Sequence, residues 1–277
     1  MRARPGRFLS AVLAGSALLA TTGSTLLTAP AAVAAPAAAR PAPPVVGQDV
    51  SWPQCPAGRG GYSLPMPSRN AAFVIVGLTN GRGFTANPCV TSQAAWARAA
   101  RVPAAAYLVT TYPTRAQKRR WGASGPLRGT RLPDRVYNVG WAQAMDAVRV
   151  LRRSGLRVNA VWIDIEANRV RPWSTDTSAN TALIRGVAAA LRRAGLRPGL
   201  YTNRSSWTTY TDGARLGLPE WRTVGARSRA EAVAACAATP LNGGRVLLAQ
   251  HWTTTVDHDV LCPPLTSRAA FARWFAR

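Results

Sequence analysis

Hydrophobic positions along the chain form short runs that alternate with longer amphipathic segments. Eight of these runs have the length and the apolar, β-branched composition of strands. They span residues 45–51, 71–79, 102–111, 159–167, 196–203, 220–227, 245–252 and 256–261. Helical periodicity occupies residues 90–101, 135–154 and 178–193 between them, and Gly155 and Gly195 end the last two segments.

This alternation of strand and helix predicts an α/β fold, an irregular (β/α)8 TIM-like barrel. The irregularity is expected in the last third of the chain. Only short helices fit after Asn203 and near Arg229, and almost nothing separates the last two strands. Residues 45–277 contain no internal Pro/Ser/Gly linker, so they are expected to form a single barrel domain.

The start of the chain has the pattern of an export signal. Arg2, Arg4 and Arg7 precede a mainly apolar run, and Ala32-Val33-Ala34 offers a small-residue cleavage site. We expect residues 1–34 to be a signal peptide and residues 35–44 to be an Ala/Pro-rich disordered tether. No run reaches the ~18 apolar residues of a membrane span. A secreted, extracellular or cell-wall-associated protein without stable membrane insertion is predicted.

The four cysteines fit export, because an oxidising compartment favours disulfides for an even count. Three connectivities are possible. Cys55–Cys89 and Cys236–Cys262 are favoured, since each pair would join loops near neighbouring strands. A zinc site is less favoured because the sequence has no CxxC pair. No metal and no cofactor are predicted.

Basic residues dominate the charge of the chain. The formal net charge of +24 becomes +21 without the three signal arginines (24 − 3). A compositional bias toward Arg and Ala is the preferred explanation, ahead of attraction to an anionic surface such as a cell wall. Nucleic acid is not predicted as a partner, because the arginines are scattered and no nucleic-acid-binding motif is present. We expect a monomer.

The stretch VWIDIEAN at residues 161–168 places two carboxylates in an apolar strand. Asp164 and Glu166 are two residues apart and so point to the same side, whereas Ile163 and Ile165 point outward to the helices. Ionised carboxylates are rarely buried without partners. Either arginines neutralise this pair, or the pair faces a polar cavity, and the position at a carboxyl end of a barrel strand favours the cavity.

Other polar residues occur at strand ends as well. Asp49 ends the first strand in GQDVS, Asn203 ends the fifth in YTN, and Asp257 opens the segment VDHDV. Several of the 11 acidic residues would therefore converge on one rim of the barrel.

Six segments together resemble the glycoside hydrolase family 25 lysozymes (N-acetylmuramidases) and related glycoside-hydrolase-like domains of exported actinobacterial proteins. The resemblance extends over residues 45–260. The segments are, in order, QDVSWPQ, FVIVGLTNGRGFTANP, AAAYLVTT, VWIDIEA, PGLYTN and AQHWTTTVDHDV. The D-x-E strand is the most specific of them, because an Asp in D-V-S precedes it and Y-T-N follows.

The resemblance implies cleavage of the β-1,4 bond between N-acetylmuramic acid and N-acetylglucosamine in peptidoglycan. Glu166 matches the general acid, and the charge of Asp164 together with burial would raise its pKa. Asp164 would stay ionised, to stabilise the transition state or orient the acetamido group. Asp49 and Asp257 match the other carboxylates of the family, in positioning and charge balance.

The residues expected to bind substrate at this rim are Asn80, Tyr107, Tyr201, Asn203 and Trp252. Tyr107, Tyr201 and Trp252 are candidates for a surface on which sugar rings stack, with ordinary barrel core as the alternative for each. Asn80 replaces the acid that commonly ends the second strand in the family, and Leu108 replaces a polar residue of the third.

The basic segment of residues 112–134 is predicted to be a substrate lid or a solvated loop. The substitutions at Asn80 and Leu108 keep two alternatives to a muramidase open: a non-catalytic cell-wall glycan-binding domain on a hydrolase-like barrel, and a hydrolase of a different glycan.

Overall fold

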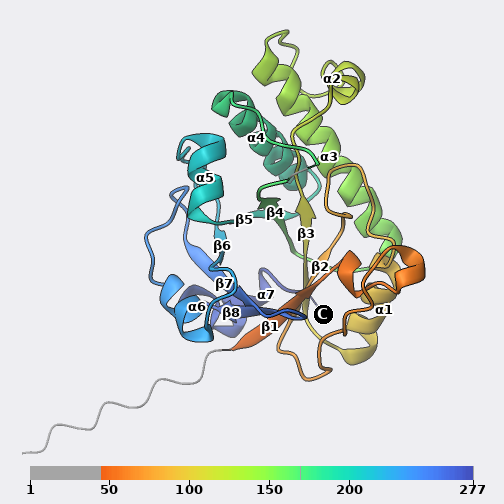
Figure 1. The fold of residues 1–277 in the computed structure, drawn as a ribbon, viewed down its shortest axis with the longest axis vertical. Coiled ribbons are helices and arrows are strands. Elements are labelled where there is room, and N and C mark those ends of the chain that lie inside the picture. The colour runs from red at the N-terminus through yellow and green to blue at the C-terminus, as the bar shows by residue number, and fades with distance from the viewer. Residues whose placement is uncertain (1–44, 169, 277) are drawn as a thin grey trace, which may run out of the picture. The chain divides into compact units, whose positions relative to one another are not determined.

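A computed structural model describes residues 45–168 and 170–276, which form one closed barrel with helices outside it (Figure 1). The predicted signal peptide and tether lie outside the described residues. The strands are β1 (Val46–Val50), β2 (Val74–Gly77), β3 (Ala104–Val109), β4 (Ala160–Ile165), β5 (Arg197–Thr202), β6 (Glu220–Thr223), β7 (Val246–Trp252) and β8 (Asp257–Leu261). They pair in chain order and close with β8 against β1. The prediction of an irregular (β/α)8 TIM-like barrel is confirmed.

The irregularity lies at β8. Strands β1 to β7 pair in parallel, whereas β8 is antiparallel to both β7 and β1. The reason is the length of the connection, because residues 253–256 can form only a hairpin, and a parallel crossover needs a dozen or more residues. The amino end of β8 therefore lies at the rim where the other strands end, and Asp257 sits opposite both Asp49 and Trp252.

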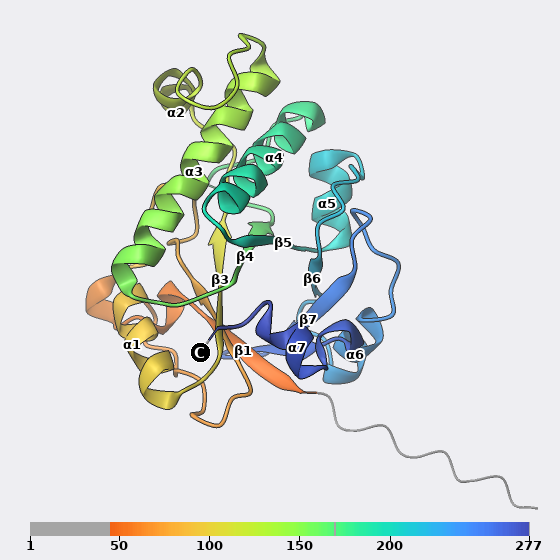
Figure 2. The same ribbon diagram turned by 180° about the vertical axis from the view of Figure 1, so that it is seen from behind.

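Helices surround the strands, as Figure 2 also shows. They are α1 (Val90–Ala100), α2 (Arg115–Trp121), α3 (Leu132–Ser154), α4 (Thr177–Arg193), α5 (Arg204–Thr211), α6 (Arg229–Ala235) and α7 (Arg268–Ala272), with 3₁₀ turns η1 (Trp52–Gln54), η2 (Ala57–Arg59) and η3 (Pro263–Leu265). The short helices predicted after Asn203 and near Arg229 are α5 and α6. The segment 112–134 contains α2, and Asn138 of α3 ties it down by donating to the carbonyls of Gly122 and Leu127, both at 2.8 Å.

Helices α3 and α4 lie side by side in both ribbon views (Figures 1 and 2). Two glycines permit this close approach. A Cβ on Gly140 would come within 2.1 Å of the Leu183 carbonyl oxygen, and one on Gly186 within 2.1 Å of the Tyr137 carbonyl oxygen. The backbones of α3 and α4 are therefore in contact where the two helices cross, which fixes the position of α3 against α4.

Alternate side chains of each strand divide between two buried layers. Trp162, Tyr201 and Trp221 fill the barrel interior, while Ile163 and Ile165 pack with the helices, as predicted for β4. Leu108 is fully buried in the helix-facing layer. The expectation that Leu108 removes a polar group from the rim is wrong, because its strand position points away from the barrel interior.

The amino ends of the strands are closed by the end of the chain. Trp274 stacks on Trp162 with ring centroids 4.9 Å apart, and Phe275 lies 4.7 Å from Phe73. Ala276 pairs with Ala104 of β3. Bulky side chains therefore fill the barrel interior at this end.

Both favoured disulfides are present. Cys55 is bonded to Cys89 and Cys236 to Cys262, with Cα atoms 5.7 and 5.2 Å apart. The first fixes the loop after β1 to the start of α1, and the second joins α6 to the end of β8. Within the described part of the chain, no helix has the length and apolar character to cross a bilayer.

Candidate active site

A cavity of about 360 Å³ opens at the carboxyl end of the barrel. Its lining consists of Asp49, Tyr107, Asp164, Glu166, Tyr201, Trp221, Gln250, Trp252 and Asp257. Larger hollows of about 530 and 710 Å³ are lined by arginines and apolar residues and include no carboxylate. The acidic cavity is therefore the candidate active site.

Seven of the residues predicted from the sequence line this cavity: all four predicted carboxylates, the two tyrosines and Trp252. They come from β1, β3, β4, β5, β7 and β8, or directly follow those strands. Asp257 belongs to this group because β8 is antiparallel and begins at the rim. Convergence of these side chains agrees with the expectation drawn from strand-end positions.

Two predicted substrate residues are placed differently. Asn80 is exposed and is not part of the cavity lining; its backbone oxygen accepts a hydrogen bond from the Thr85 hydroxyl at 3.2 Å. Asn203 is the N-cap of α5, and its side-chain oxygen accepts from the Ser206 amide at 2.9 Å. The local structure thus gives Asn203 a capping contact at the start of a helix.

Three residues at the site were missed from the sequence: Gln250, Trp221 and Asp259. The Tyr201 hydroxyl donates to the Gln250 Oε1 atom at 2.7 Å, and Gln250 Nε2 donates to Asp49 Oδ2 at 2.7 Å. Below them, the Trp221 indole donates to Asp259 Oδ1 at 2.9 Å. The sequence pattern that could have identified two of them is the period-two alternation of strands. Gln250 shares a face of β7 with Trp252, and Asp259 shares a face of β8 with Asp257.

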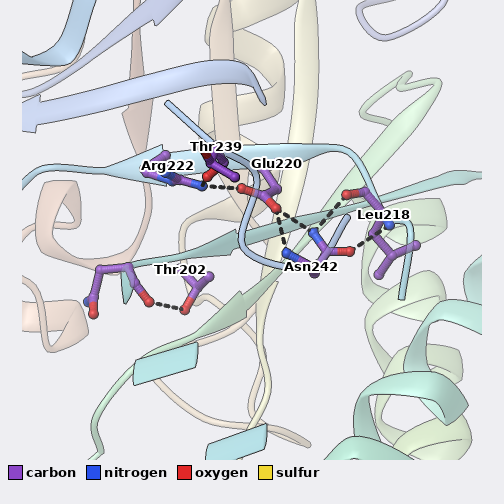
Figure 3. Close-up of polar contacts among 7 residues, drawn as sticks. Thr202, Leu218, Glu220, Arg222, Thr239 and Asn242 are labelled. Atoms are coloured by element: carbon purple, nitrogen blue, oxygen red, sulfur yellow. Dashed lines mark hydrogen bonds and ion pairs between the residues drawn. The ribbon is translucent and has the colours of Figure 1, made fainter. Parts of the chain in front are cut away.

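The carboxylates of the barrel interior are not paired with arginine. Among the residues described, ion pairs join Arg131 with Asp134, Arg149 with Asp146, Arg222 with Glu220, and Arg227 with Glu231. None of these pairs involves a cavity carboxylate or Asp259. The buried pair Arg222–Glu220 lies on the outward side of β6 (Figure 3). These contacts favour the polar cavity over an Arg–carboxylate network.

Burial without a cation raises the pKa of every carboxyl group in this cluster. Desolvation is the main cause for each. It raises the pKa of Asp257 to about 6. The pKa values of Asp49, Asp164 and Asp259 are raised well above 3.8, and the charges of Asp257 and Asp259 add to the rise at Asp49. The cluster therefore retains protons at a pH where isolated carboxyl groups are ionised.

Asp164 and Glu166 differ in depth. Asp164 is 6% exposed, and its Oδ1 atom has no hydrogen-bond partner among the described residues, whereas Glu166 is only half-buried. Desolvation raises the pKa of Glu166, and the Tyr201 hydroxyl opposes that rise. Desolvation and then the charge of Glu166 raise the pKa of Asp164 well above its usual value. Burial therefore opposes the ionised state predicted for Asp164, which is the more deeply buried of the two.

Comparison with solved structures gives relatives with the same fold. A muramidase from Acremonium alcalophilum is 19% identical, with a TM-score of 0.54, over 83% of this chain and 97% of that one. A bacterial lysozyme from Streptomyces coelicolor is 17% identical, with a TM-score of 0.55, over 83% and 97%. A family GH25 lysozyme from Aspergillus fumigatus is 19% identical, with a TM-score of 0.51, over 80% and 95%.

The barrel has the fold of the family 25 lysozymes. This confirms, at the level of the fold, the resemblance drawn from the sequence. A family model described as "Lys-1: Lysozyme-like protein 1" also matches residues 132–221, the segment that carries Asp164, Glu166 and Tyr201. No curated protein gives a significant match to the sequence as a whole. Within the described residues, no group of three or more His, Cys, Asp or Glu side chains is arranged to hold a metal ion.

Proposed function

We propose that this protein is a secreted glycoside hydrolase that cleaves the β-1,4 bond between N-acetylmuramic acid and N-acetylglucosamine in peptidoglycan. The observation that carries the proposal is the acidic cavity, in which Asp49, Asp164, Glu166 and Asp257 meet and form no ion pair with an arginine among the described residues. Glycoside hydrolysis uses a carboxylic acid to protonate the leaving oxygen and a second carboxylate to stabilise positive charge on the sugar. The lysozyme-like fold supports the choice of glycan.

Glu166 is assigned the role of general acid. It follows β4 at the mouth of the cavity and is only half-buried, so its carboxyl group can reach a glycosidic oxygen that approaches from outside. Desolvation raises its pKa in the direction that keeps it protonated before the reaction. After Glu166 has given its proton to the leaving oxygen, water at the open side of the cavity can solvate the resulting carboxylate.

Asp164 is assigned the role of electrostatic stabiliser at the base of the cavity. Burial is the main cause of its raised pKa, and the charge of Glu166 adds to the rise once Glu166 has given up its proton. Asp164 acts in its carboxylate form, after its proton has been released to solvent through the open cavity, and this form stabilises the positive charge that develops at the anomeric carbon in the transition state. Asp49 and Asp257 add negative potential from the opposite wall, and Gln250 fixes the orientation of Asp49 through the 2.7 Å hydrogen bond.

The aromatic residues are assigned to sugar binding according to exposure. Trp252 is 43% exposed at the end of β7 and presents an indole face at the mouth of the cavity. Tyr201 is 7% exposed and donates its hydroxyl to Gln250, so it shapes the wall and positions polar groups. Tyr107 lines the wall contributed by β3.

Release of reducing ends from purified peptidoglycan tests the proposal. Glu166→Gln removes the acid proton but keeps the shape of the side chain, and a loss of at least about 10²–10⁴-fold in rate is expected. Glu231→Gln serves as the matched control, because Glu231 is a surface residue of α6 outside the cavity. A Glu166→Gln variant that releases reducing ends at the wild-type rate would exclude Glu166 from the mechanism.

A glycan-binding domain without turnover is the second candidate. It was motivated by Asn80 and Leu108, yet Leu108 faces the helix layer and Asn80 lies outside the cavity lining, so neither change removes a group from the cavity. Binding of peptidoglycan by the wild type with no release of reducing ends would favour this alternative. A hydrolase of another glycan would be recognised by the mass of its products.

A further inference from the structure

Three exposed apolar side chains lie at the rim that carries the cavity. Among the described residues, the large hydrophobic side chains with the greatest exposure are Val45, Tyr62, Leu132, Val170, Val233 and Trp252. Tyr62, Val170 and Trp252 lie in the loops after β1 and β4 and at the end of β7. Trp252 lines the cavity, whereas Tyr62, at 67% exposure, does not and has no role in the chemistry described above.

Tyr62 packs against a second aromatic residue of the same loop. Its ring meets that of Trp52 edge to face, with centroids 4.9 Å apart and an interplanar angle of 63°. Trp52 is itself half-buried, so the pair presents one aromatic surface with the tyrosine outermost. We call these two residues the rim aromatic pair.

The loop that carries the rim aromatic pair is held rigidly. The Tyr62 amide donates to the Pro53 carbonyl at 2.9 Å, and the Ser63 amide donates to the Cys55 carbonyl at 2.8 Å. Cys55 is bonded to Cys89 at the start of α1. A rigid loop presents aromatic side chains to a ligand at a low cost in conformational entropy.

Short chains of contacts connect the rim aromatic pair to the cavity. Ser51, the residue before Trp52, lies beside the cavity residue Tyr107, because a Cβ placed on Gly77 would come within 2.4 Å of the Ser51 Cβ atom and within 2.9 Å of the Tyr107 ring. On the other side, a Cβ placed on Gly81 would lie 3.9 Å from the Trp52 indole nitrogen, and the Gly81 carbonyl accepts from Asn168 Nδ2 at 3.0 Å. Asn168 follows Glu166 by two residues, so the pair stands beside the loop that carries the proposed acid.

We propose that Trp52 and Tyr62 bind a sugar ring of the glycan strand at a position outside the acidic cavity. The ligand class is a polymer of N-acetylated hexosamines, whose rings offer an apolar C–H face to aromatic side chains and polar groups to the tyrosine hydroxyl. With Trp252 at the cavity mouth, the protein then holds the strand at two separate places. This inference rests on the proposed function, since it names a second contact for the same substrate.

Binding to insoluble purified peptidoglycan, measured in the Glu166→Gln background to prevent turnover, tests the proposal. The added double substitution Trp52→Ala/Tyr62→Ala is expected to weaken binding by about tenfold or more, while binding of a soluble disaccharide fragment stays unchanged. Tyr62→Ala alone alters a side chain that is mostly exposed, so it keeps the test valid if the double variant fails to fold. Val233→Ala, an exposed apolar residue of α6, is the control and should bind like the parent.

Unchanged binding to insoluble peptidoglycan in both Tyr62→Ala and the double variant would overturn the role of the pair. Failure of the proposed function looks different, because the wild type would then release no reducing ends. Weakened binding in the Tyr62→Ala and double variants would support the pair even in that case, since the assay does not depend on turnover.

Discussion

The two sides of the β-barrel bury carboxyl groups in opposite ways. On the outward side of β6, Glu220 bonds to Arg222 at 2.5 Å and accepts hydrogen bonds from the Asn242 amide and side chain at 2.8 and 2.7 Å (Figure 3). Inside the barrel, Asp164 is also buried, but among the described residues it forms no ion pair and its Oδ1 atom has no hydrogen-bond partner.

The difference separates structural from chemical use of a buried acid. Removing a charge from water is costly, and a protein can offset this cost with a paired cation or can leave the group protonated. Glu220 follows the first course and fixes the loop that carries Asn242 to β6. The cavity carboxyls follow the second, although the chain has 35 basic residues and only 11 acidic ones. Such an uncompensated cluster is a feature of sites that transfer protons.

The largest effect on stability is expected on the paired side. Arg222→Met leaves Glu220 buried with only the Asn242 donors, and the free energy of unfolding should fall by about 3–5 kcal/mol. Denaturant unfolding measures this loss, with Glu231→Gln as a control that disturbs an exposed pair. A loss below about 1 kcal/mol would contradict a structural role for the buried pair.

Replacing a buried acid inside the barrel is expected to raise the free energy of unfolding instead of lowering it. Asp164→Asn removes an acid whose folded-state pKa is raised, and such a group costs stability increasingly as pH rises above its unfolded pKa near 4. The variant should equal the wild type near pH 4 and be more stable by about 1–3 kcal/mol at pH 8, while losing activity. Destabilisation at pH 8 would show that Asp164 makes a favourable ionic contact.

Asp257→Asn should show a smaller version of the same behaviour. Because its folded pKa is about 6, the stability difference between variant and wild type should develop between about pH 4 and 6. Above pH 6 the variant should be more stable by about 1–2 kcal/mol, since the partial exposure of Asp257 reduces the effect. Unfolding free energies measured from pH 4 to 8 should show the wild type losing stability across that window relative to the variant. Parallel curves would place the pKa of Asp257 at its ordinary value.

The smallest effect concerns Asn203, which lies at the same rim but caps α5. Asn203→Ala should cost about 1 kcal/mol of stability with KM for peptidoglycan unchanged. Steady-state kinetics together with thermal unfolding separate the two roles. A raised KM with unchanged stability would support the earlier prediction that Asn203 binds substrate.

The sequence was sufficient to predict the barrel and the position of its acids, because strand periodicity determines which side chains share a face. Asp164 and Glu166 were placed correctly in this way. The antiparallel direction of β8 was not predicted, although the four-residue connection between β7 and β8 is too short for a parallel crossover. A motif match alone cannot place Leu108, because its neighbour Tyr107 faces the cavity and Leu108 therefore faces the helices. Gln250 and Asp259 were missed because their importance depends on partners far apart in sequence, namely Asp49 and Trp221.

Titration of the carboxyl groups by ¹³C NMR on the purified protein tests most directly whether the cavity holds its acids protonated. The account predicts a midpoint of about 6 for Asp257, midpoints well above 3.8 for Asp49 and Asp164, and about 2 for the surface residue Glu231. The Asp→Asn variants assign the signals. Titration of all the cavity carboxyls near pH 4 would contradict the account, because it would mean that the cavity compensates their charge.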